Sequence, residues 1–422
     1  MRILHTSDWH LGKTLMGMDR LSEQEAFVEE ICLIADDEKI DLVLLAGDIF
    51  DTYNPPAAAE ELFCEAMDRL SRGGSRAVVV IAGNHDNPER LCAVSPLAVR
   101  QGVFLLGTPR DTATQTVTSA DFSGKVCCVQ AGKGCLEIAS PGCRHRAALL
   151  TLPYPSEARL KEVISLDLDE ALFQKAYSEK VKELLHLGAE AFREDTVNLL
   201  VSHIFTMGGK ESDSERPIQL GGACTVYPEA FPRQVQYAAL GHLHRPQRIV
   251  PAPVPIYYAG SPLAYSFSEA NQSKAVYIVD VHPGGEPDVK ALYINSGKPL
   301  VRMTAMGGIS EVHRWIEEGK HKDAWVELEV YLKEIMLPQE IAAIKKAHPG
   351  IITIKPVFIS SDQKQEASLH RSSLPIDELF KQFYKQRSGG ALPDEETVRL
   401  FLELLNEDAH EGTSDEQGEA AS

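Results

Sequence analysis

Five apolar segments before residue 245 each end in side chains that commonly bind metal ions. The ends read SDWH (7–10), AGDIFD (46–51), AGNHD (82–86), VSHIF (201–205) and ALGHLH (239–244). The segments have the composition of buried strands, and helical stretches at 21–38 and 157–192 alternate with them, which predicts a layered α/β fold. Because sites in such folds form at the carboxyl ends of strands, we expect the five ends to line one cleft.

The side chains at these ends form a donor set that suits two metal ions. Residues two apart on an extended segment point to the same side, so Asp8 and His10 can project as a pair. The same spacing separates His242 from His244. The set holds two carboxylates, one amide oxygen and four imidazoles: Asp8, Asp48, Asn84, His10, His203, His242 and His244. One carboxylate must bridge the ions to hold them about 3.5–4 Å apart, as two-metal hydrolysis requires.

The donor types also narrow the choice of metal. Magnesium prefers oxygen ligands, whereas a mixed nitrogen and oxygen set suits manganese or iron better and leaves zinc open. Each segment has a simpler interpretation when taken alone, because an Asp-x-His pair is usually a capped turn and a buried histidine is usually a core residue. Five such ends in one series favour a binuclear metal centre that attracts phosphate.

The size and composition of the chain predict a globular cytoplasmic protein. Its 422 residues, 44% of them apolar, are too many for one ordinary core, so two or three domains are expected. No run approaches the roughly 18 apolar residues of a membrane span, and the N-terminus does not resemble a signal peptide. The eight cysteines show no CxxC spacing, which is typical of reduced thiols.

The net charge of −19 does not decide whether the partner is a nucleic acid. An acidic chain generally repels nucleic acid, but residues 406–422 alone hold six acidic residues and no lysine or arginine. Such a tail is typical of a solvated, disordered end. Bound divalent cations would change the local charge further.

The chain divides into successive regions by composition. After residue 274, strand-like segments (AVYIVDV, VKALYI and AWVELEV) and two helical stretches suggest a small α+β domain, and a polar segment and two amphipathic helices follow. The predicted boundaries are 1–270 for the domain with the five strand ends, 274–360 for the small domain, 361–373 for a linker, 374–406 for helices that would bind a partner and 407–422 for the acidic tail.

The motif series resembles a known superfamily. The order Asp-x-His, Gly-Asp, Gly-Asn-His-Asp, His and Gly-His-x-His is similar to that of the calcineurin-like metallophosphoesterases. Within them, the stretches MRILHTSDWHLGK, GDIFDTYNPP, ALGHLHRPQ and YAGSPLAYSF closely resemble the bacterial SbcD family of nuclease subunits. The resemblance implies a four-layer α/β sandwich, a small α+β capping domain and C-terminal helices. Residues 105–195 contain no motif that we recognise.

The resemblance also implies a role for each site residue. One metal would be held by Asp8, His10, Asp48 and His244, and the other by Asp48, Asn84, His203 and His242, with Asp48 bridging. His85 would bind no metal, and its imidazole would stabilise or protonate the leaving oxygen. Asp86 would orient that imidazole or the surrounding loop. Archaeal relatives have a second non-ligand histidine where this chain has Asp51, so Asp51 is not assigned that role.

For activity, the resemblance implies a manganese-dependent DNA nuclease, acting as a 3′→5′ exonuclease on double-stranded ends and as an endonuclease on hairpins. It further implies a partner, an SbcC-type ATPase with a long coiled coil, in a complex that contains two copies of each subunit. A phosphomonoesterase or nucleotide phosphodiesterase would not need the additional domain and helices. A non-catalytic scaffold would not need the full ligand set together with His85.

Overall fold

The structure is a computed structural model. It describes residues 1–116, 124–160, 170–215, 224–332, 334–358, 380–381, 384, 392–394 and 397–399. It divides into two compact units, Met1–Val357 and Phe358–Ser422. The predicted linker, partner-binding helices and acidic tail lie outside the described residues, except for the few positions beyond 358 named above.

Six strands form the first large sheet, in the order β15-β14-β1-β2-β3-β4. Four of them are parallel: β1 (Arg2–Thr6), β2 (Leu42–Ala46), β3 (Ala77–Ile81) and β4 (Val103–Leu106). The antiparallel edge consists of β14 (Ala275–Asp280) and β15 (Asp288–Tyr293). β2 and β3 are apolar throughout because both of their faces are buried. The outer face packs against α1 (Leu21–Asp37) and α2 (Ala57–Ser71).

Seven strands form the second large sheet, in the order β12-β13-β11-β8-β7-β6-β5. Their bounds are β5 (Cys127–Gly132), β6 (Cys135–Ala139), β7 (Arg146–Leu152), β8 (Thr196–His203), β11 (Tyr237–Gly241), β12 (Gln247–Arg248) and β13 (Ile256–Tyr258). Helix α6 (Glu170–Gly188) covers the outer face through Tyr177, Val181 and Leu185. Shorter elements lie between the larger ones: α3 (Pro88–Cys92), α4 (Ser95–Ala98), α5 (Glu157–Leu160), β9 (Phe205–Thr206) and β10 (Thr225–Val226).

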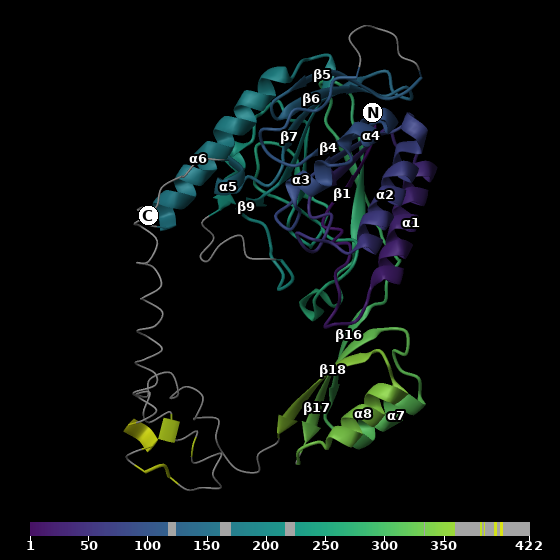
Figure 1. Ribbon diagram of the computed structural model, residues 1–422, viewed down its shortest axis with the longest axis vertical. Helices are drawn as coiled ribbons and strands as arrows, with labels where there is room; N and C mark the ends of the chain where they lie inside the picture. Colours follow the sequence, from purple (N-terminus) through teal and green to yellow (C-terminus); the bar gives the residue numbers. More distant parts are fainter. Residues whose placement is uncertain are drawn as a thin grey trace, which may run out of the picture. The chain divides into compact units, whose positions relative to one another are not determined.

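The two large sheets pack face to face, which gives four layers. Their shared core contains Leu44 and Val79 from the first sheet and Leu199 and Ala239 from the second. Figure 1 shows α1 and α2 on one side of this pair of sheets and α6 on the other. The predicted four-layer α/β sandwich is therefore confirmed.

A third sheet, in the order β16-β17-β18, forms a small α+β layer with its own core. Its elements are β16 (Leu300–Ala305), α7 (Ile309–Glu317), β17 (Trp325–Leu332), α8 (Pro338–Ala347) and β18 (Ile351–Phe358). Val326, Leu328 and Val330 alternate along β17 and pack with Val312 of α7 and Ile344 of α8, as the period of two in a strand requires. The helices α7 and α8 are drawn beside this sheet in Figure 1.

The small sheet begins later in the chain than we expected. The expected domain 274–360 includes β14 and β15, but β14 pairs antiparallel with β1, and β15 pairs with β14. Both strands therefore extend the first large sheet, and the small sheet starts at β16. The change of composition near residue 274 marks the antiparallel edge of the first sheet, and a sequence pattern does not reveal a pairing partner so far away.

Two features of the described residues bear on the predictions from composition. These residues include all eight cysteines, and they contain no disulfide. None of the helices within them combines the length and the apolar character that a membrane span needs.

Arg76, the residue before β3, forms hydrogen bonds with the C-terminal ends of both α1 and α2. The residue is 2% exposed, and its guanidinium donates hydrogen bonds to the carbonyls of Ala35, Ile40 and Leu70 and to the Asp36 carboxylate. Replacing it with methionine should remove all four bonds and lower the free energy of unfolding by about 2–4 kcal/mol, because carbonyl oxygens beside a buried side chain lose a charged donor. Urea denaturation measures the change.

The exposed Arg72, also at the end of α2, provides the matched control. Arg72→Met should change the free energy of unfolding by less than about 0.5 kcal/mol. Equal losses in the two variants would mean that Arg76 is not a special support of these helix ends.

Candidate metal centre

The predicted donors come from both large sheets and meet where their strands end. The first sheet supplies residues that follow β1, β2 and β3, namely Asp8, His10, Asp48 and Asn84. The second supplies the last residue of β8 and two residues after β11, namely His203, His242 and His244. Donor atoms of Asp8, His10 and His244 lie within 4.8 Å of one another, and so do those of Asp8, Asp48 and His203.

The backbone at several donors adopts a conformation that L-residues rarely adopt. The φ angles are 54° at Asp8, 46° at His10, 50° at Asp48 and 104° at His242. Such conformations cost about 1–3 kcal/mol each and concentrate at functional sites. The expectation that Asp8 and His10 lie on an extended segment is therefore wrong, because their side chains converge through left-handed turns.

Glycines before the donors allow the strand ends to approach closely, both within the first sheet and between the two sheets. A Cβ atom at Gly241 would lie 1.8 Å from the carbonyl oxygen of Ala46, across the sandwich. A Cβ atom at Gly83 would lie 2.1 Å from the Asp48 carboxylate. Any larger residue at either position would separate the strand ends that carry the donors.

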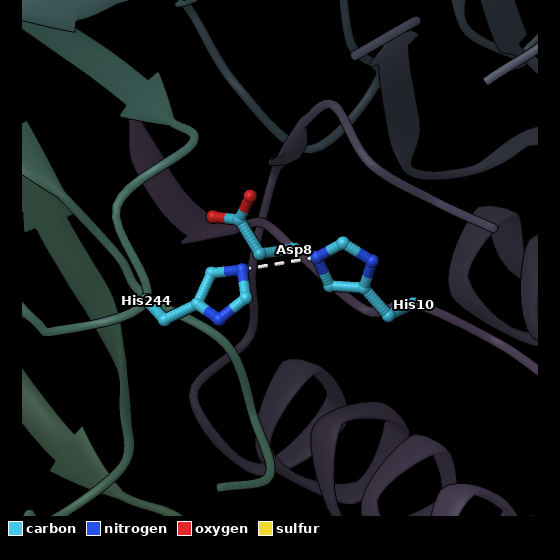
Figure 2. A group of neighbouring side chains, drawn as sticks. All are labelled: Asp8, His10 and His244. Atoms are coloured by element: carbon cyan, nitrogen blue, oxygen red, sulfur yellow. Dashed lines mark hydrogen bonds between the residues drawn. The ribbon is translucent and has the colours of Figure 1, made fainter. Parts of the chain in front are cut away.

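Asp8, His10 and His244 form the first donor group, shown in Figure 2. The Nε2 atoms of His10 and His244 face each other at 3.0 Å, which two ring nitrogens can do if they share a proton or a cation. Burial lowers the pKa of His10 to about 3, so its imidazole is neutral at pH 7 and offers a lone pair. Burial raises the pKa of Asp8 to about 6, and a neighbouring cation would favour its ionised form.

Asp48 lies between imidazoles of the two sheets. Its Oδ1 accepts a hydrogen bond from the backbone N–H of His85 at 2.9 Å. Its Oδ2 lies 3.4 Å from Nε2 of His203 and 3.8 Å from Nε2 of His10. One carboxylate oxygen is thus fixed by the loop, and the other lies between the two donor groups, as a bridging ligand requires.

Asn84, His203 and His242 form the other donor group. The side-chain oxygen of Asn84 lies 2.9 Å from Nε2 of His203 and 3.4 Å from Nδ1 of His242. Burial lowers the pKa of His242 well below its usual value, so this imidazole is neutral. Burial alone would also lower the pKa of His203, but the Asp48 carboxylate outweighs burial and raises that pKa to about 9. A carboxylate that attracts a proton here would equally attract a divalent cation.

In His203 and His244, the ring nitrogen that faces away from the centre is held by the protein. Nδ1–H of His203 donates to the carbonyl of Ala46 at 2.9 Å. Nδ1 of His244 shares a hydrogen bond with the Ser214 hydroxyl at 2.6 Å. Contacts of this kind fix the tautomer and leave Nε2 free for a metal. The residues therefore fit a binuclear centre for divalent metals.

His85 and Asp86 have separate partners. Nδ1–H of His85 donates to the carbonyl oxygen of Asp51 at 2.6 Å, which leaves Nε2 on the side of Asp48. The Asp86 carboxylate accepts three backbone N–H groups, from Ile49, Phe50 and Gly83. Of the two roles we considered for Asp86, these contacts correspond to fixing the loop and not to orienting the imidazole. Burial raises the pKa of Asp86 to about 6.

Asp51, whose role the sequence left open, supports the histidines from outside. Its carboxylate lies 2.7 Å from Nζ of Lys13 and 3.5 Å from Nδ1 of His10. Burial opposes ionisation of this carboxyl, but His10 and Lys13 outweigh burial and lower its pKa below the usual range. Asp51 is therefore ionised at neutral pH and lies beside a ligand.

Other supporting residues carried no sequence signal. Gln24 on α1 donates to the carbonyls of His10 and Lys13 at 3.2 Å each. Lys274, in a segment that reads as a connection between domains, donates to the carbonyl of His244 at 2.9 Å. Each acts on the backbone of a ligand segment and belongs to no motif, so only the folded arrangement reveals it.

Comparisons with known proteins agree with this geometry. Residues 1–246 match the family described as calcineurin-like phosphoesterase, and residues 296–388 match the type 5 capsule protein repressor C-terminal domain. A protein named as the D subunit of nuclease SbcCD, from Bacillus subtilis (strain 168), is 47% identical over 406 residues, which cover 96% of this chain and 98% of the relative. Its namesake from Rhodobacter capsulatus is 32% identical over 318 residues, 73% and 72% of the two chains.

Among solved structures, a dimetal phosphatase from Danio rerio matches 70% of this chain and 99% of its own, at 14% identity and a TM-score of 0.37. The sequence matches establish the family. The first family model covers more than half of the chain, and the match to the Bacillus relative covers nearly all of it. The chain therefore belongs to the calcineurin-like phosphoesterase family, in the group that contains the SbcD components of SbcCD nucleases.

Proposed function

We propose that this chain is the nuclease subunit of a DNA-processing complex and that it hydrolyses phosphodiester bonds with two divalent metal ions. The observation that carries the proposal is the convergence of two carboxylates, an amide and four imidazoles beside a further histidine whose Nε2 makes no protein hydrogen bond among the described residues. A site with this donor set and a positioned acid suits phosphate ester hydrolysis.

The ligands divide into two groups that share Asp48. Asp8, His10 and His244 would hold one ion, and Asn84, His203 and His242 would hold the other. When bound, the two ions supply Lewis acidity and make water a nucleophile at neutral pH. The mixed nitrogen and oxygen donors favour manganese over magnesium.

The remaining chemistry belongs to His85. Its Nδ1–H is committed to the carbonyl of Asp51, so Nε2 is the atom that can carry a proton toward the leaving oxygen. A leaving alkoxide is a strong base, and proton donation to it typically accelerates a reaction by about 10²–10⁴-fold. Asp86 holds the loop that presents His85 through three backbone N–H groups.

For substrate and partner, the proposal follows the relatives that are named as components of nuclease SbcCD. We infer 3′→5′ exonuclease action on double-stranded DNA ends and endonuclease action on hairpins. The partner would be an SbcC-type ATPase with a coiled coil, in a complex with two copies of each protein. Support comes from the match to a second, C-terminal family over residues 296–388, which a small-molecule phosphatase would not need.

The test is to purify the chain alone and with its ATPase, and to assay end-labelled duplex DNA, hairpin DNA and p-nitrophenyl phosphate. Each substrate is tested with manganese, magnesium, iron and zinc. The proposal expects DNA cleavage that is fastest with manganese, and shortening of duplexes from the 3′ end. Hydrolysis of p-nitrophenyl phosphate without DNA cleavage would indicate a phosphomonoesterase, and no hydrolysis with any metal would indicate a scaffold.

Truncation after Ser360 tests where the ATPase binds. We expect a folded, metal-loaded nuclease domain that no longer co-purifies with the ATPase, because amphipathic helices on a tethered segment generally dock on a partner. Manganese content and melting temperature report the state of the remaining domain. Truncation after residue 406, which removes only the acidic tail, provides the control. Undiminished co-purification after truncation at Ser360 would move the interface to the domain that remains.

A further inference from the structure

A single arginine from the region without a recognised motif contacts the loop that presents Asn84 and His85. Arg159 lies in α5, after the end of β7. Its Nη1 donates to the carbonyl of Gly83 at 2.8 Å, and its Nη2 donates to the carbonyl of Asp86 at 2.6 Å. The two acceptors flank Asn84 and His85, so one planar guanidinium spans the segment that carries a ligand and an acid.

The loop is held from both sides. On one side Arg159 binds the carbonyls of Gly83 and Asp86. On the other side the Asp86 carboxylate accepts the backbone N–H groups of Gly83, Ile49 and Phe50. Carbonyl and amide groups at the loop ends are therefore both satisfied, which leaves the loop little freedom to turn.

The loop position also sets the bridging carboxylate. The backbone N–H of His85 donates to Oδ1 of Asp48, and Oδ2 of Asp48 faces the imidazoles of His203 and His10. A rotation of the loop would therefore displace Asn84 and release Oδ1 of Asp48 together. The effect should fall mainly on the ion that Asn84 binds, because that ion would lose one ligand and have another misplaced.

Arg159 is itself fixed by neighbouring groups. Its backbone N–H donates to the Ser156 hydroxyl at 3.3 Å, and its guanidinium carbon lies 5.5 Å from the centre of the Tyr154 ring. A second arginine, Arg110, contacts α5 at a different point, where it donates to the carbonyl of Leu160 at 2.6 Å. Burial lowers the pKa of Arg159, and the carboxylate of Asp86 opposes this shift, so the guanidinium stays charged at neutral pH.

We propose that Arg159 is a positioning residue of the metal centre, which clamps the loop 83–86 so that Asn84 and His85 face the bound ions. The inference rests on the proposed function for its catalytic part and on the binuclear donor set for its metal-binding part. A planar fork of donors matches two carbonyls held at a fixed separation, which the single ammonium of lysine does less well.

The experiment compares Arg159→Met with Arg159→Lys and with Arg110→Met in the full-length chain. Arg110→Met is the matched control because it also removes an arginine bond to α5 but leaves the loop contacts in place. Calorimetric titration with manganese chloride measures the two binding events. Rates on duplex DNA at saturating manganese separate kcat from KM, and melting curves report the fold.

We expect Arg159→Met to weaken one of the two manganese-binding events by about 10–100-fold, the usual effect of losing a residue that orients a ligand. The other event should change much less, kcat should fall, and KM for DNA should stay near that of the wild type. Arg159→Lys should recover part of the affinity and of kcat. Arg110→Met should bind both ions as the wild type does.

Two outcomes would overturn the inference. One is unchanged binding of both ions and unchanged kcat in Arg159→Met. The other is an equal loss in Arg110→Met, which would mean that α5 merely stabilises the fold. If Arg159→Met unfolds, the comparison of Arg159→Lys with Arg110→Met decides between the same outcomes. A wild-type chain that binds two ions but cleaves no DNA would refute the proposed function and leave the metal-binding test intact.

Discussion

Replacing Asp48 with alanine should abolish tight binding of both metal ions and lower DNA cleavage by about 10³-fold or more. Oδ2 of Asp48 lies 3.4 Å from Nε2 of His203 and 3.8 Å from Nε2 of His10, so both ions would lose their shared anion. The repulsion between two divalent ions about 3.5–4 Å apart would then no longer be offset. Elemental analysis of manganese per chain and rates on end-labelled duplex DNA measure the two effects.

Two further variants make the result interpretable. Asp280→Ala removes a half-exposed carboxylate that pairs with Arg2 at 3.3 Å, and it should keep both ions and full activity. Asp48→Asn keeps an acceptor for the N–H of His85 but loses the charge, so it separates loop support from charge. Two tightly bound ions together with full activity in Asp48→Ala would refute the bridging role.

The positions of the donors could be inferred from the sequence because ligand-type residues follow strand-like segments. The carboxyl ends of β1, β2 and β3 are adjacent in the first sheet, and β8 and β11 are adjacent in the second. Once the α/β layering was predicted, it followed that the five strand ends with ligand-type residues lie close together. The structure has this convergence, with donor atoms of Asp8, His10 and His244 within 4.8 Å of one another.

The way in which the donors converge could not be inferred. Asp8, His10 and Asp48 have positive φ angles, and although Asp and His adopt such angles more often than other residues do, most of them do not, so local preference does not predict these three. Their conformations are imposed by contacts from distant segments, such as the bonds from Gln24 on α1 to the carbonyls of His10 and Lys13. Local propensity predicts a strand end, and tertiary contacts decide the turn that follows.

Residues 105–195 show a different limit of prediction from sequence. The strands β5, β6 and β7 lie there, and β5 forms the edge of the second sheet with a register shift between Cys128 and Gln130. A half-buried edge strand with such an irregularity lacks the regular alternation on which strand prediction depends. Nothing in this region pointed to Arg159 either, because its role depends on two backbone carbonyls that are far away in the sequence.

Replacing His85 with asparagine should keep the fold and both metal ions but lower cleavage by about 10²–10⁴-fold, the usual contribution of a positioned acid. The backbone N–H of His85, which holds Oδ1 of Asp48, is retained in the variant. The bond from Nδ1–H to the carbonyl of Asp51 is the protein contact of the imidazole that asparagine would have to replace. Manganese content, DNA affinity and kcat are measured on one preparation.

The basicity of the leaving group separates catalysis from bracing of the loop. A general acid matters most when the leaving oxygen is a strong base, so His85→Asn should lose much more activity on DNA than on bis(p-nitrophenyl) phosphate, a diester whose leaving phenolate is a weak base. If the imidazole merely braces the loop, removing it should loosen Asn84, so that manganese and activity are lost in parallel. His313→Asn on the exposed side of α7 should change neither. Because Asp86 and Arg159 hold the loop through backbone groups that the substitution leaves intact, we expect the metals to stay bound and the loss of rate to be largest on the substrate with the more basic leaving group.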